Sequence, residues 1–342
     1  MEEFILNDPS LETQWRSLIL FGKNSATYKF AFAKSLLDLV EHGSTVIYLE
    51  ELALTYSSHI VNHLRNHDKQ GSSQTSQFLE ACRNRRDGLI SDEELYKITL
   101  KKGFVNVVDA FQNVAGGEVL NKFYEKDYSG KGQRLIITDD LLSLKSRYQY
   151  VNLNEEVEGR WRLVETAWNV GISPHLIQVE HNIENDNLFL QTSLMKRLDV
   201  TSARSALNGY QKGKCFYCYR DISINSGEDD ICHVDHFLPH VHKREHLPAN
   251  INGVWNLVLS CSTCNGSSEK GARVAEKEYL LHLYKRNEFY ILSQHPLAET
   301  IVNQTGNTTS QRQSFLNKHY QIAYDMNPTS LWKPKERFEC LF

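Results

Sequence analysis

Two pairs of cysteines with the spacing C-x-x-C constrain this chain more than any other feature of its sequence. Cys215 and Cys218 form the first pair, Cys261 and Cys264 form the second pair, and 42 residues lie between the two pairs. Each pair can offer two thiolates to one tetrahedral ion at about 2.3 Å, so together they complete a Cys₄ zinc site. We therefore predict a structural Zn²⁺ ion that holds together a small domain whose own core is limited.

The remaining cysteines, Cys82, Cys232 and Cys340, have no partner at ligand spacing. We interpret them as ordinary buried or surface thiols. The chain starts with acidic residues instead of a basic, apolar secretory signal, and it has no apolar run of roughly 18 residues. These features predict a cytoplasmic protein without a membrane span, in which paired cysteines bind metal more often than they form disulfides.

The charge of the chain limits how it could bind nucleic acid. A net charge of −4 excludes a protein coated in positive charge, but it is compatible with an enzyme whose basic surface is local. The densest basic region of the first half consists of Arg83, Arg85, Arg86, Lys97, Lys101 and Lys102. This region either extends a surface for a nucleic-acid backbone or, as is more common, forms a solvated helix face.

Hydrophobic periodicity predicts mostly helices in the first half of the chain. Helices are expected over residues 26–41, 91–101 and 154–169, and a short strand over residues 134–138. Residues 45–49 form either another short strand or a continuation of the preceding helix. The helix over 91–101 begins with the Ser-x-x-Glu spacing of a capping box. The helix over 154–169 carries a stripe of valine and tryptophan residues, which indicates packing in a core.

The composition changes near residue 205, where the cysteine-containing part begins. Residues 231–239 and 254–260 have strand composition, and a helix is expected from about 265 or 270 to 284. The order is therefore cysteine pair, strand, long loop, strand, cysteine pair and helix. We predict an α+β protein with three parts: a mostly helical N-terminal domain over residues 1–204, a small metal-dependent domain over 205–290 and a C-terminal extension over 291–342.

The residues between and beside the cysteine pairs form a known pattern. Asp235 and His236 are followed by Pro239, Asn256 opens the run Asn-Leu-Val-Leu before the second pair, and Asn265 follows that pair directly. With its two cysteine pairs, the segment over residues 212–285 resembles the HNH nucleases of the ββα-metal class, a resemblance that covers less than a quarter of the chain. It implies a ββα-metal domain that hydrolyses phosphodiester bonds.

The resemblance also implies roles for individual residues. His236 matches the first His of the family and Asn256 the middle Asn, which is expected to brace the loop that carries His236. Asn265 stands in place of the final His, a substitution that is common in the family. A plain turn-ending asparagine is the alternative for Asn256.

The residue types at these positions suit the hydrolysis of a phosphodiester independently of the resemblance to a family. Hydrolysis of a phosphodiester needs a water activated near neutral pH and a cation that stabilises charge on the phosphate. His236, with an ordinary pKa of about 6.5, can take the proton of the water. Asp235 and Asn265 can give two oxygen ligands to Mg²⁺ or Mn²⁺ and leave room for phosphate. Because Asn265 directly follows Cys264, bound zinc would fix its position.

Several histidines near this pattern are second-rank candidates. His233 would share a strand face with Asp235, either as a further metal ligand or as a structural histidine. His240, His242 and His246 follow in the loop, where they would contact phosphate or be solvated.

The sequence departs from the family at its usual lysine. The position three residues after Asn265 holds Ser268, and the next basic residues are Lys270 and Arg273. Either could contact phosphate at the start of the following helix.

The predicted function is a divalent-metal-dependent endonuclease that acts on DNA, while RNA shares the same site chemistry. The closest analogy is to bacterial restriction or anti-phage nucleases, which suggests an ATPase, a helicase or another defence protein as a partner. The alternative is a non-catalytic zinc module that binds nucleic acid or a partner protein. Such a module would need the cysteines but not Asp235, His236 or Asn265.

Overall fold

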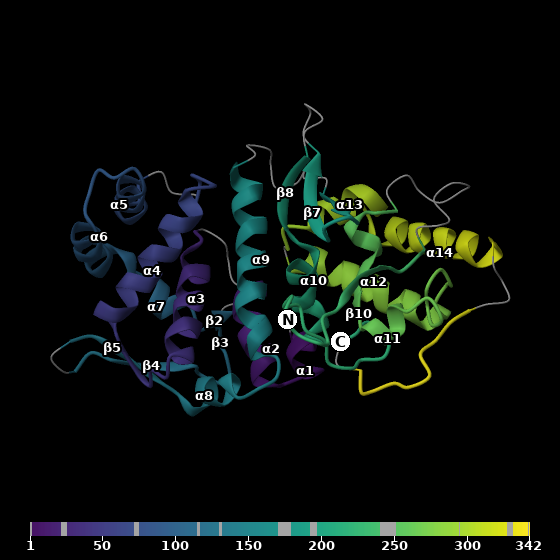
Figure 1. Ribbon diagram of the computed structural model, residues 1–342, viewed down its shortest axis with the longest axis horizontal. Coiled ribbons are helices and arrows are strands. Elements are labelled where there is room, and N and C mark those ends of the chain that lie inside the picture. Colours follow the sequence, from purple (N-terminus) through teal and green to yellow (C-terminus); the bar gives the residue numbers. More distant parts are fainter. Residues whose placement is uncertain are drawn as a thin grey trace. The chain divides into compact units, whose positions relative to one another are not determined.

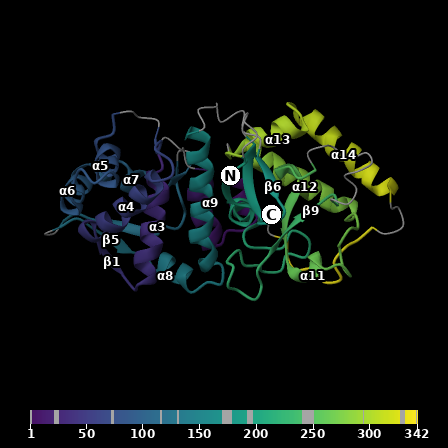
Figure 2. The ribbon, with the colours of Figure 1, turned by 45° about the horizontal axis from the view of Figure 1, so that its top comes forward.

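The computed structural model describes residues 2–21, 26–71, 75–114, 117–129, 132–169, 179–191, 197–239, 251–293, 295–326, 331–340 and 342. The chain divides into two units, Met1–Gly171 and Ile172–Phe342, each a mixture of helices and small antiparallel sheets (Figures 1 and 2). This division does not coincide with the boundaries expected after residues 204 and 290. Strands before residue 204 and helices after residue 290 contact the elements between them, so all these elements group in the second unit.

The first unit is predominantly helical. Its helices are α1 (Glu2–Leu6), α2 (Leu11–Phe21), α3 (Tyr28–Glu41), α4 (Leu49–Leu64), α5 (Gln77–Arg86), α6 (Asp92–Ile98), the π-helix Thr99–Gly103, α7 (Val107–Ala110), α8 (Asp139–Lys145) and α9 (Tyr150–Asn169). Its strands are β1 (Val46–Tyr48), β2 (Asn113–Val114), β3 (Gly117–Glu118), β4 (Tyr124–Asp127) and β5 (Arg134–Ile137). β5 lies between β1 and β4 in one sheet, and β2 and β3 pair separately.

The helices α3, α4 and α9 pack around the apolar core of this unit (Figure 1). The predicted stripe lies on α9, where Val157 and Trp161 are buried and Trp168 is partly buried. The capping box is also confirmed, since the Ser91 side chain accepts from the backbone N–H of Glu94, whose side chain reaches back. The helix expected through residue 101 is α6, which ends at Ile98, and the π-helix follows it directly.

The second unit begins with a three-stranded antiparallel sheet that periodicity did not predict. It consists of β6 (Val179–Asn182), β7 (Asn187–Gln191) and β8 (Arg197–Ser202), with β7 in the middle. Strands of four to six residues carry too few alternations to stand out in a sequence. Residues 1–204 are therefore less uniformly helical than expected. Helix α10 (Ala203–Gln211) follows β8 directly and contacts β9 and β10.

The two runs predicted as strands form a short antiparallel pair, β9 (His233–His236) and β10 (Leu257–Ser260). The register places His236 opposite Leu257, and Asp235 opposite Val258. A 3-10 turn over Val254–Asn256 precedes β10, and the four-residue helix α11 (Ser262–Asn265) follows it.

The helix expected from about 265 or 270 to 284 is α12, which begins only at Lys277 and extends to Leu292. The intervening residues form turns, and Gly271 has a φ of +46°, a value that interrupts a right-handed helix. Helices α13 (Ala298–Thr305) and α14 (Thr309–Met326) follow α12. Among the described residues, no helix has the length and apolar character needed to cross a membrane.

A C-terminal tail over residues 331–340 returns past α11 (Figure 1, yellow). The Trp332 backbone N–H donates to the Val274 carbonyl at 2.8 Å, and the Glu276 N–H donates to the Trp332 carbonyl at 2.9 Å. Further on, the Phe338 N–H donates to the carbonyl of Cys218 at 2.8 Å. The tail therefore lies against the first cysteine pair and the segment that precedes α12.

Candidate metal centre and adjoining polar site

The four predicted zinc ligands meet at one point inside the second unit. The sulfur atoms of Cys215, Cys218, Cys261 and Cys264 all lie within 4.8 Å of one another, and all four residues are buried. The Sγ atoms of Cys218 and Cys261 are 3.7 Å apart. A tetrahedral zinc with bonds of about 2.3 Å has ligand–ligand distances of about 3.8 Å, whereas a disulfide needs about 2.05 Å. The cluster therefore fits a metal ion such as zinc.

The local backbone explains why the two pairs converge. The N–H of Phe216 donates to the Leu259 carbonyl at 2.9 Å, which ties the first pair to β10, and β10 runs directly into Cys261. The sulfur of Cys261 accepts from the N–H of Cys264 at 3.4 Å at the start of α11. A hydrogen bond from Cys215 lowers the pKa of the Cys261 thiol, whereas burial raises the pKa of Cys215 itself, because the close sulfur atoms share protons unevenly.

The other three cysteines lie outside this cluster. Cys82 belongs to the core of the first unit, and Cys340 is exposed. Cys232 is buried, and burial raises its pKa to about 12, which keeps it a neutral thiol. None of them has the spatial neighbours of a metal ligand among the described residues.

Asp235 lies on β9 and is held by two buried partners. Its Oδ2 accepts from the hydroxyl of Tyr217 at 2.6 Å and from the ammonium of Lys270 at 2.9 Å. Lys270 also donates to the carbonyl of His236 at 2.8 Å, and its side chain is 0% exposed. We predicted Lys270 as a possible phosphate contact, but its ammonium is buried as the counter-ion of Asp235. It fixes the strand that carries Asp235 and His236.

Asn256 is fully buried, and its side chain joins two backbone segments that precede it in the chain. Its Oδ1 accepts from the N–H of Leu238 at 2.8 Å, and its Nδ2 donates to the carbonyls of Leu238 and Ile251 at 3.0 Å each. Its own carbonyl accepts from the N–H of Phe237 at 2.8 Å. These bonds hold the end of β9, where His236 lies, against the turn before β10.

Asn265 ends α11, which contacts β9, and it is half-buried. Asp235 and Asn265 are the oxygen donors expected for a catalytic cation, and one carboxylate with one amide suits Mg²⁺, which keeps several waters. Lys270 competes for the same carboxylate, so the charge available to a cation is reduced. Among the described residues, only the cysteine cluster brings three or more His, Cys, Asp or Glu ligand atoms together.

A histidine that sequence patterns did not reveal lies beside His236. His181, on β6, has its ring centroid 5.7 Å from that of His236, with 50° between the ring planes. Its Nε2 lies 3.2 Å from Oδ1 of Asp186, a carboxylate that also forms an ion pair with Arg204. His181 precedes His236 by 55 residues, outside the cysteine pairs, and belongs to no motif. Only the fold brings it to the site.

The second-rank candidates are placed as follows. His233 starts β9 and is half-buried, and its charge contributes to lowering the pKa of Asp186. Arg273 donates to the Ser268 carbonyl at 2.8 Å. His240, His242 and His246 lie outside the described residues.

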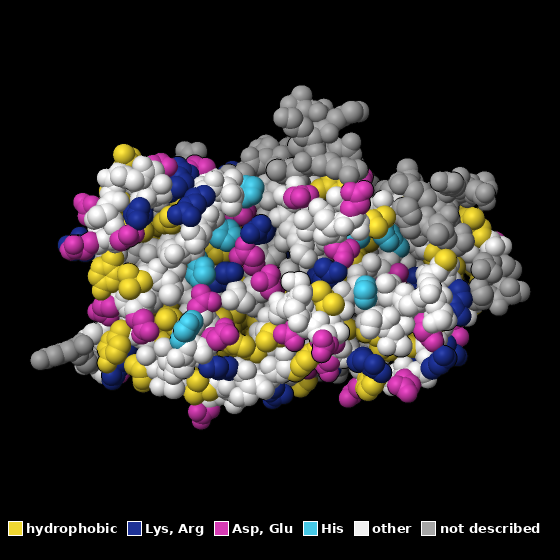
Figure 3. All heavy atoms as spheres, in the orientation of Figure 1, with side chains coloured by type: hydrophobic (Ala, Val, Ile, Leu, Met, Phe, Trp, Pro, Cys, Tyr) yellow, Lys and Arg dark blue, Asp and Glu magenta, His cyan; other side chains and the backbone are white. Residues whose placement is uncertain are grey.

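Four of the six residues of the basic region in the first unit form ion pairs with acidic side chains. Arg83 and Arg86 form ion pairs with Asp68, Arg85 with Asp92, and Lys97 with Glu93; Arg86 also pairs with Asp87. Basic and acidic side chains intermingle over α5 and α6 on the visible face (Figure 3). This pairing favours a solvated helix face over a surface for the nucleic-acid backbone.

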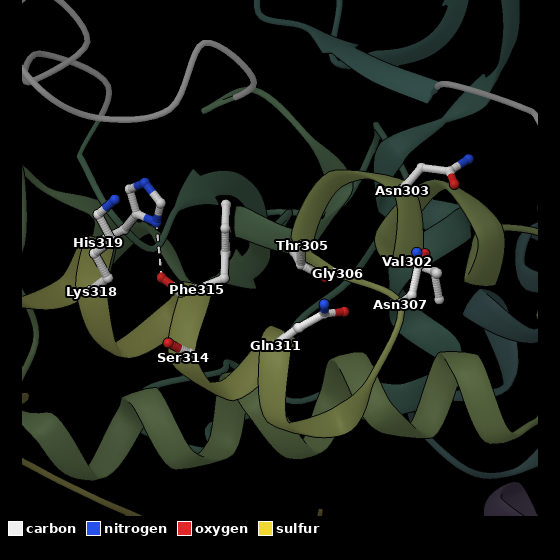
Figure 4. A pocket seen from close by; sticks show the side chains of 10 residues that line it. All are labelled: Val302, Asn303, Thr305, Gly306, Asn307, Gln311, Ser314, Phe315, Lys318 and His319. Carbon is white, nitrogen blue, oxygen red and sulfur yellow. Dashed lines mark hydrogen bonds between the residues drawn. The ribbon is translucent and has the colours of Figure 1, made fainter.

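A hollow of about 650 Å³ lies between α13 and α14 (Figure 4). It is lined mainly by uncharged polar side chains, including Asn307, Gln311 and Ser314, with Lys318 and His319 at one end. Phe315 on its wall packs against Trp255, just before Asn256. None of the described residues that line this hollow is a carboxylate, so they do not suit a hard cation.

Comparison of the chain with protein-family models, with curated proteins and with solved structures finds no match.

Proposed function

We propose that this protein is a divalent-metal-dependent endonuclease that hydrolyses phosphodiester bonds, with DNA as the substrate and RNA as the alternative. The observation that carries the proposal is the pairing of β9 with β10. This pairing attaches the strand bearing Asp235 and His236 to the strand that runs into Cys261. A structural metal at the cysteines would thereby stiffen the backbone beneath an acid and a histidine. The resemblance to HNH nucleases supports the same assignment.

In the proposed reaction, His236 accepts a proton from the attacking water. Asp235 and Asn265 would hold a Mg²⁺ or Mn²⁺ ion, which when bound supplies positive charge to the phosphate and leaving oxygen. Asn256 and Lys270 act as positioning residues: Asn256 binds the backbone of Leu238, just after β9, and Lys270 binds the carbonyl of His236 and the carboxylate of Asp235.

The second candidate is a zinc module that binds nucleic acid or protein without cleaving it. The ion pair between Lys270 and Asp235 favours this candidate, because a buried ammonium already balances the carboxylate. In such a module, Asp235 would be a structural residue and the site would need no cation beyond the one at the cysteines.

Cleavage of supercoiled plasmid with Mg²⁺ or Mn²⁺ separates the two candidates. We expect wild type to nick or linearise the plasmid, and His236→Ala to lose this activity while keeping its zinc content and its circular dichroism spectrum. His42→Ala, an exposed histidine of the first unit, is the matched control. If no nucleic acid is cut, or if His236→Ala cuts as fast as wild type, the proposed role of His236 is wrong.

The same preparation decides between DNA and RNA when both are offered at equal strand concentration. A role in bacterial restriction or anti-phage defence, with an ATPase or helicase as partner, rests on the resemblance alone. It predicts that cells with the wild-type gene and its neighbours resist phage, and that cells with His236→Ala do not. Equal plaque counts in the two strains would contradict it.

A further inference from the structure

His181 and Asp186 form a buried pair beside His236 that the proposed reaction does not yet use. His181 is 3% exposed, and its backbone N–H donates to the Asn252 carbonyl at 3.1 Å, which fixes β6 near the turn before β10. Its Nε2 contacts Asp186, whereas its Nδ1 is buried without a hydrogen-bond partner among the described residues. A buried nitrogen of this kind is uncommon in a native protein and calls for a ligand.

The backbone of Asp186 adopts a conformation that is unfavourable for most residues. Its φ is +55°, in the left-handed region, which aspartate tolerates better than most residues. The carbonyl of Asp186 accepts from the N–H of Ala203 at 2.9 Å, and its carboxylate binds Arg204. Arg204 also donates to the carbonyl of Cys232 at 2.8 Å, one residue before β9. The His181–Asp186 pair is thus tied to the strand that bears His236.

These contacts select one form of the His181 ring. Burial would raise the pKa of Asp186, but the hydrogen bond with His181 and the charge of Arg204 lower it, so the carboxylate is ionised. An ionised carboxylate accepts, so Nε2 of His181 carries a proton and donates it. When the ring is neutral, its Nδ1 is then an acceptor.

In-line displacement places the attacking and leaving oxygens on opposite sides of the phosphorus. The ring centroids of His181 and His236 are 5.7 Å apart, which is short enough for both rings to lie on the side of attack, beside the attacking water.

Two rings at this distance can share one water. With hydrogen bonds of about 2.8 Å, the water oxygen would lie about 4 Å from each centroid. Centroids 5.7 Å apart then subtend roughly 90° at that oxygen, near the angle between the two O–H bonds of water. We propose that His181 is a second catalytic histidine, which accepts one hydrogen bond from the attacking water while His236 accepts the other. This inference rests on the proposed endonuclease function.

In this step the water oxygen forms a bond to phosphorus as the bond to the leaving sugar oxygen breaks. One proton passes to His236, and the other stays on the oxygen, hydrogen-bonded to Nδ1 of His181. The leaving alkoxide takes a proton from solvent. With both protons held, a lone pair of the water is directed at the phosphorus, which is the orientation that in-line attack requires.

Two amide substitutions test the role of each ring nitrogen. The side-chain oxygen of Asn lies where Nδ1 of a histidine lies, and the amide of Gln reaches the place of Nε2. We expect His181→Asn to keep kcat within a few-fold of wild type. His181→Gln and His181→Phe should lower kcat on the order of tenfold or more, with KM unchanged. His295→Gln, at another buried histidine of the same unit, is the matched control.

Asp186→Asn gives an independent variant, because Asn also tolerates the left-handed backbone. Its amide would donate to Nε2 and move the ring proton to Nδ1, so kcat should fall although the fold is kept. The inference is overturned if His181→Gln cuts like wild type while His181→Asn does not, since His181 would then only brace Asp186. Equal kcat in all variants also overturns it. If wild type cuts no nucleic acid, the proposed function fails, and this inference fails with it.

Discussion

At the scale of single residues, the buried ion pair between Asp235 and Lys270 decides how the candidate site holds charge. The lysine side chain is 0% exposed, and Asp235 is 8% exposed. A carboxylate at this depth needs a positive partner, whether an ammonium or a metal ion. Lys270 therefore makes β9 stable in the absence of a catalytic cation, and it weakens the attraction of Asp235 for one.

The substitution Lys270→Met tests whether a cation can replace the ammonium of Lys270 as the partner of Asp235. The substitution keeps most of the side-chain volume but leaves the Asp235 carboxylate buried without its counter-charge, at a cost of about 3–5 kcal/mol. Urea unfolding should show this loss, and added Mn²⁺ should restore more stability to the variant than to wild type. Lys335→Met, at an exposed pair with Glu269, should change little. An equal response of both proteins to Mn²⁺ would mean that no cation binds at Asp235.

His63 sets a pH dependence in the first unit. Its ring stacks on Trp161 at 3.5 Å and lies 2.8 Å from Glu165 and 3.2 Å from Glu158. Burial alone would lower the pKa of His63, but hydrogen bonds with Glu158 and Glu165 raise it.

A raised pKa in the folded state means that protonated His63 stabilises the unit. This contribution is complete below the unfolded pKa of about 6.5, and it is lost as the pH rises through the higher folded value. Thermal unfolding of the first unit should therefore shift to lower temperature between pH 6 and pH 8. His63→Gln should flatten this dependence, while the exposed His42→Gln should leave it. A steeper dependence in His63→Gln would contradict the assignment.

At the scale of elements, the C-terminal tail supports the first cysteine pair. The N–H of Phe338 bonds to the carbonyl of Cys218, and Trp332 and Lys335 both contact Glu269, just after the second pair. Phe338→Pro removes that N–H and should release zinc to a chelator several-fold faster. Phe338→Ala keeps the N–H and is the control. If the two variants release zinc at the same rate, the ring of Phe338 matters instead of the backbone bond.

Elements with a strong local signal could be predicted, and those set by long-range contacts could not. The stripe on α9 and the capping box of α6 follow from neighbours within the same helix. The sheet of β6, β7 and β8 was not predicted because its strands are only four to six residues long. Helix α12 begins late because the turns after Asn265, including Gly271, are set by contacts with Cys264 and the tail.

The residues of the candidate site also divide into those with a local signal in the sequence and those placed by long-range contacts. Cysteine spacing predicted the cluster, since a C-x-x-C pair carries its own geometry, and the family pattern named Asp235 and His236. The buried partner of Lys270 is Asp235, 35 residues away, so the sequence could not predict that Lys270 is buried. His181 reaches the site only through the sheet that periodicity missed.

At the scale of the whole molecule, the two units should respond differently to loss of metal. The core of the first unit draws only on residues before Gly171, whereas all four ligands of the cysteine cluster lie after Ile172. A structural zinc site contributes on the order of 10 kcal/mol, comparable with the total stability of a domain, about 5–15 kcal/mol. Without zinc, the second unit should unfold at room temperature while the first stays folded.

Calorimetry of the full chain tests this expectation. Wild type loaded with zinc should show heat absorption from both units, and Cys261→Ser or prolonged chelation should abolish the contribution of the second unit. The transition that remains should keep the pH dependence of His63, because His63 and its partners belong to the first unit. Cys82→Ser changes a cysteine outside the cluster, so it should leave the transition of the second unit in place. If chelation removed both transitions together, the first unit would depend on the metal as well, and the two units would not be independent in stability.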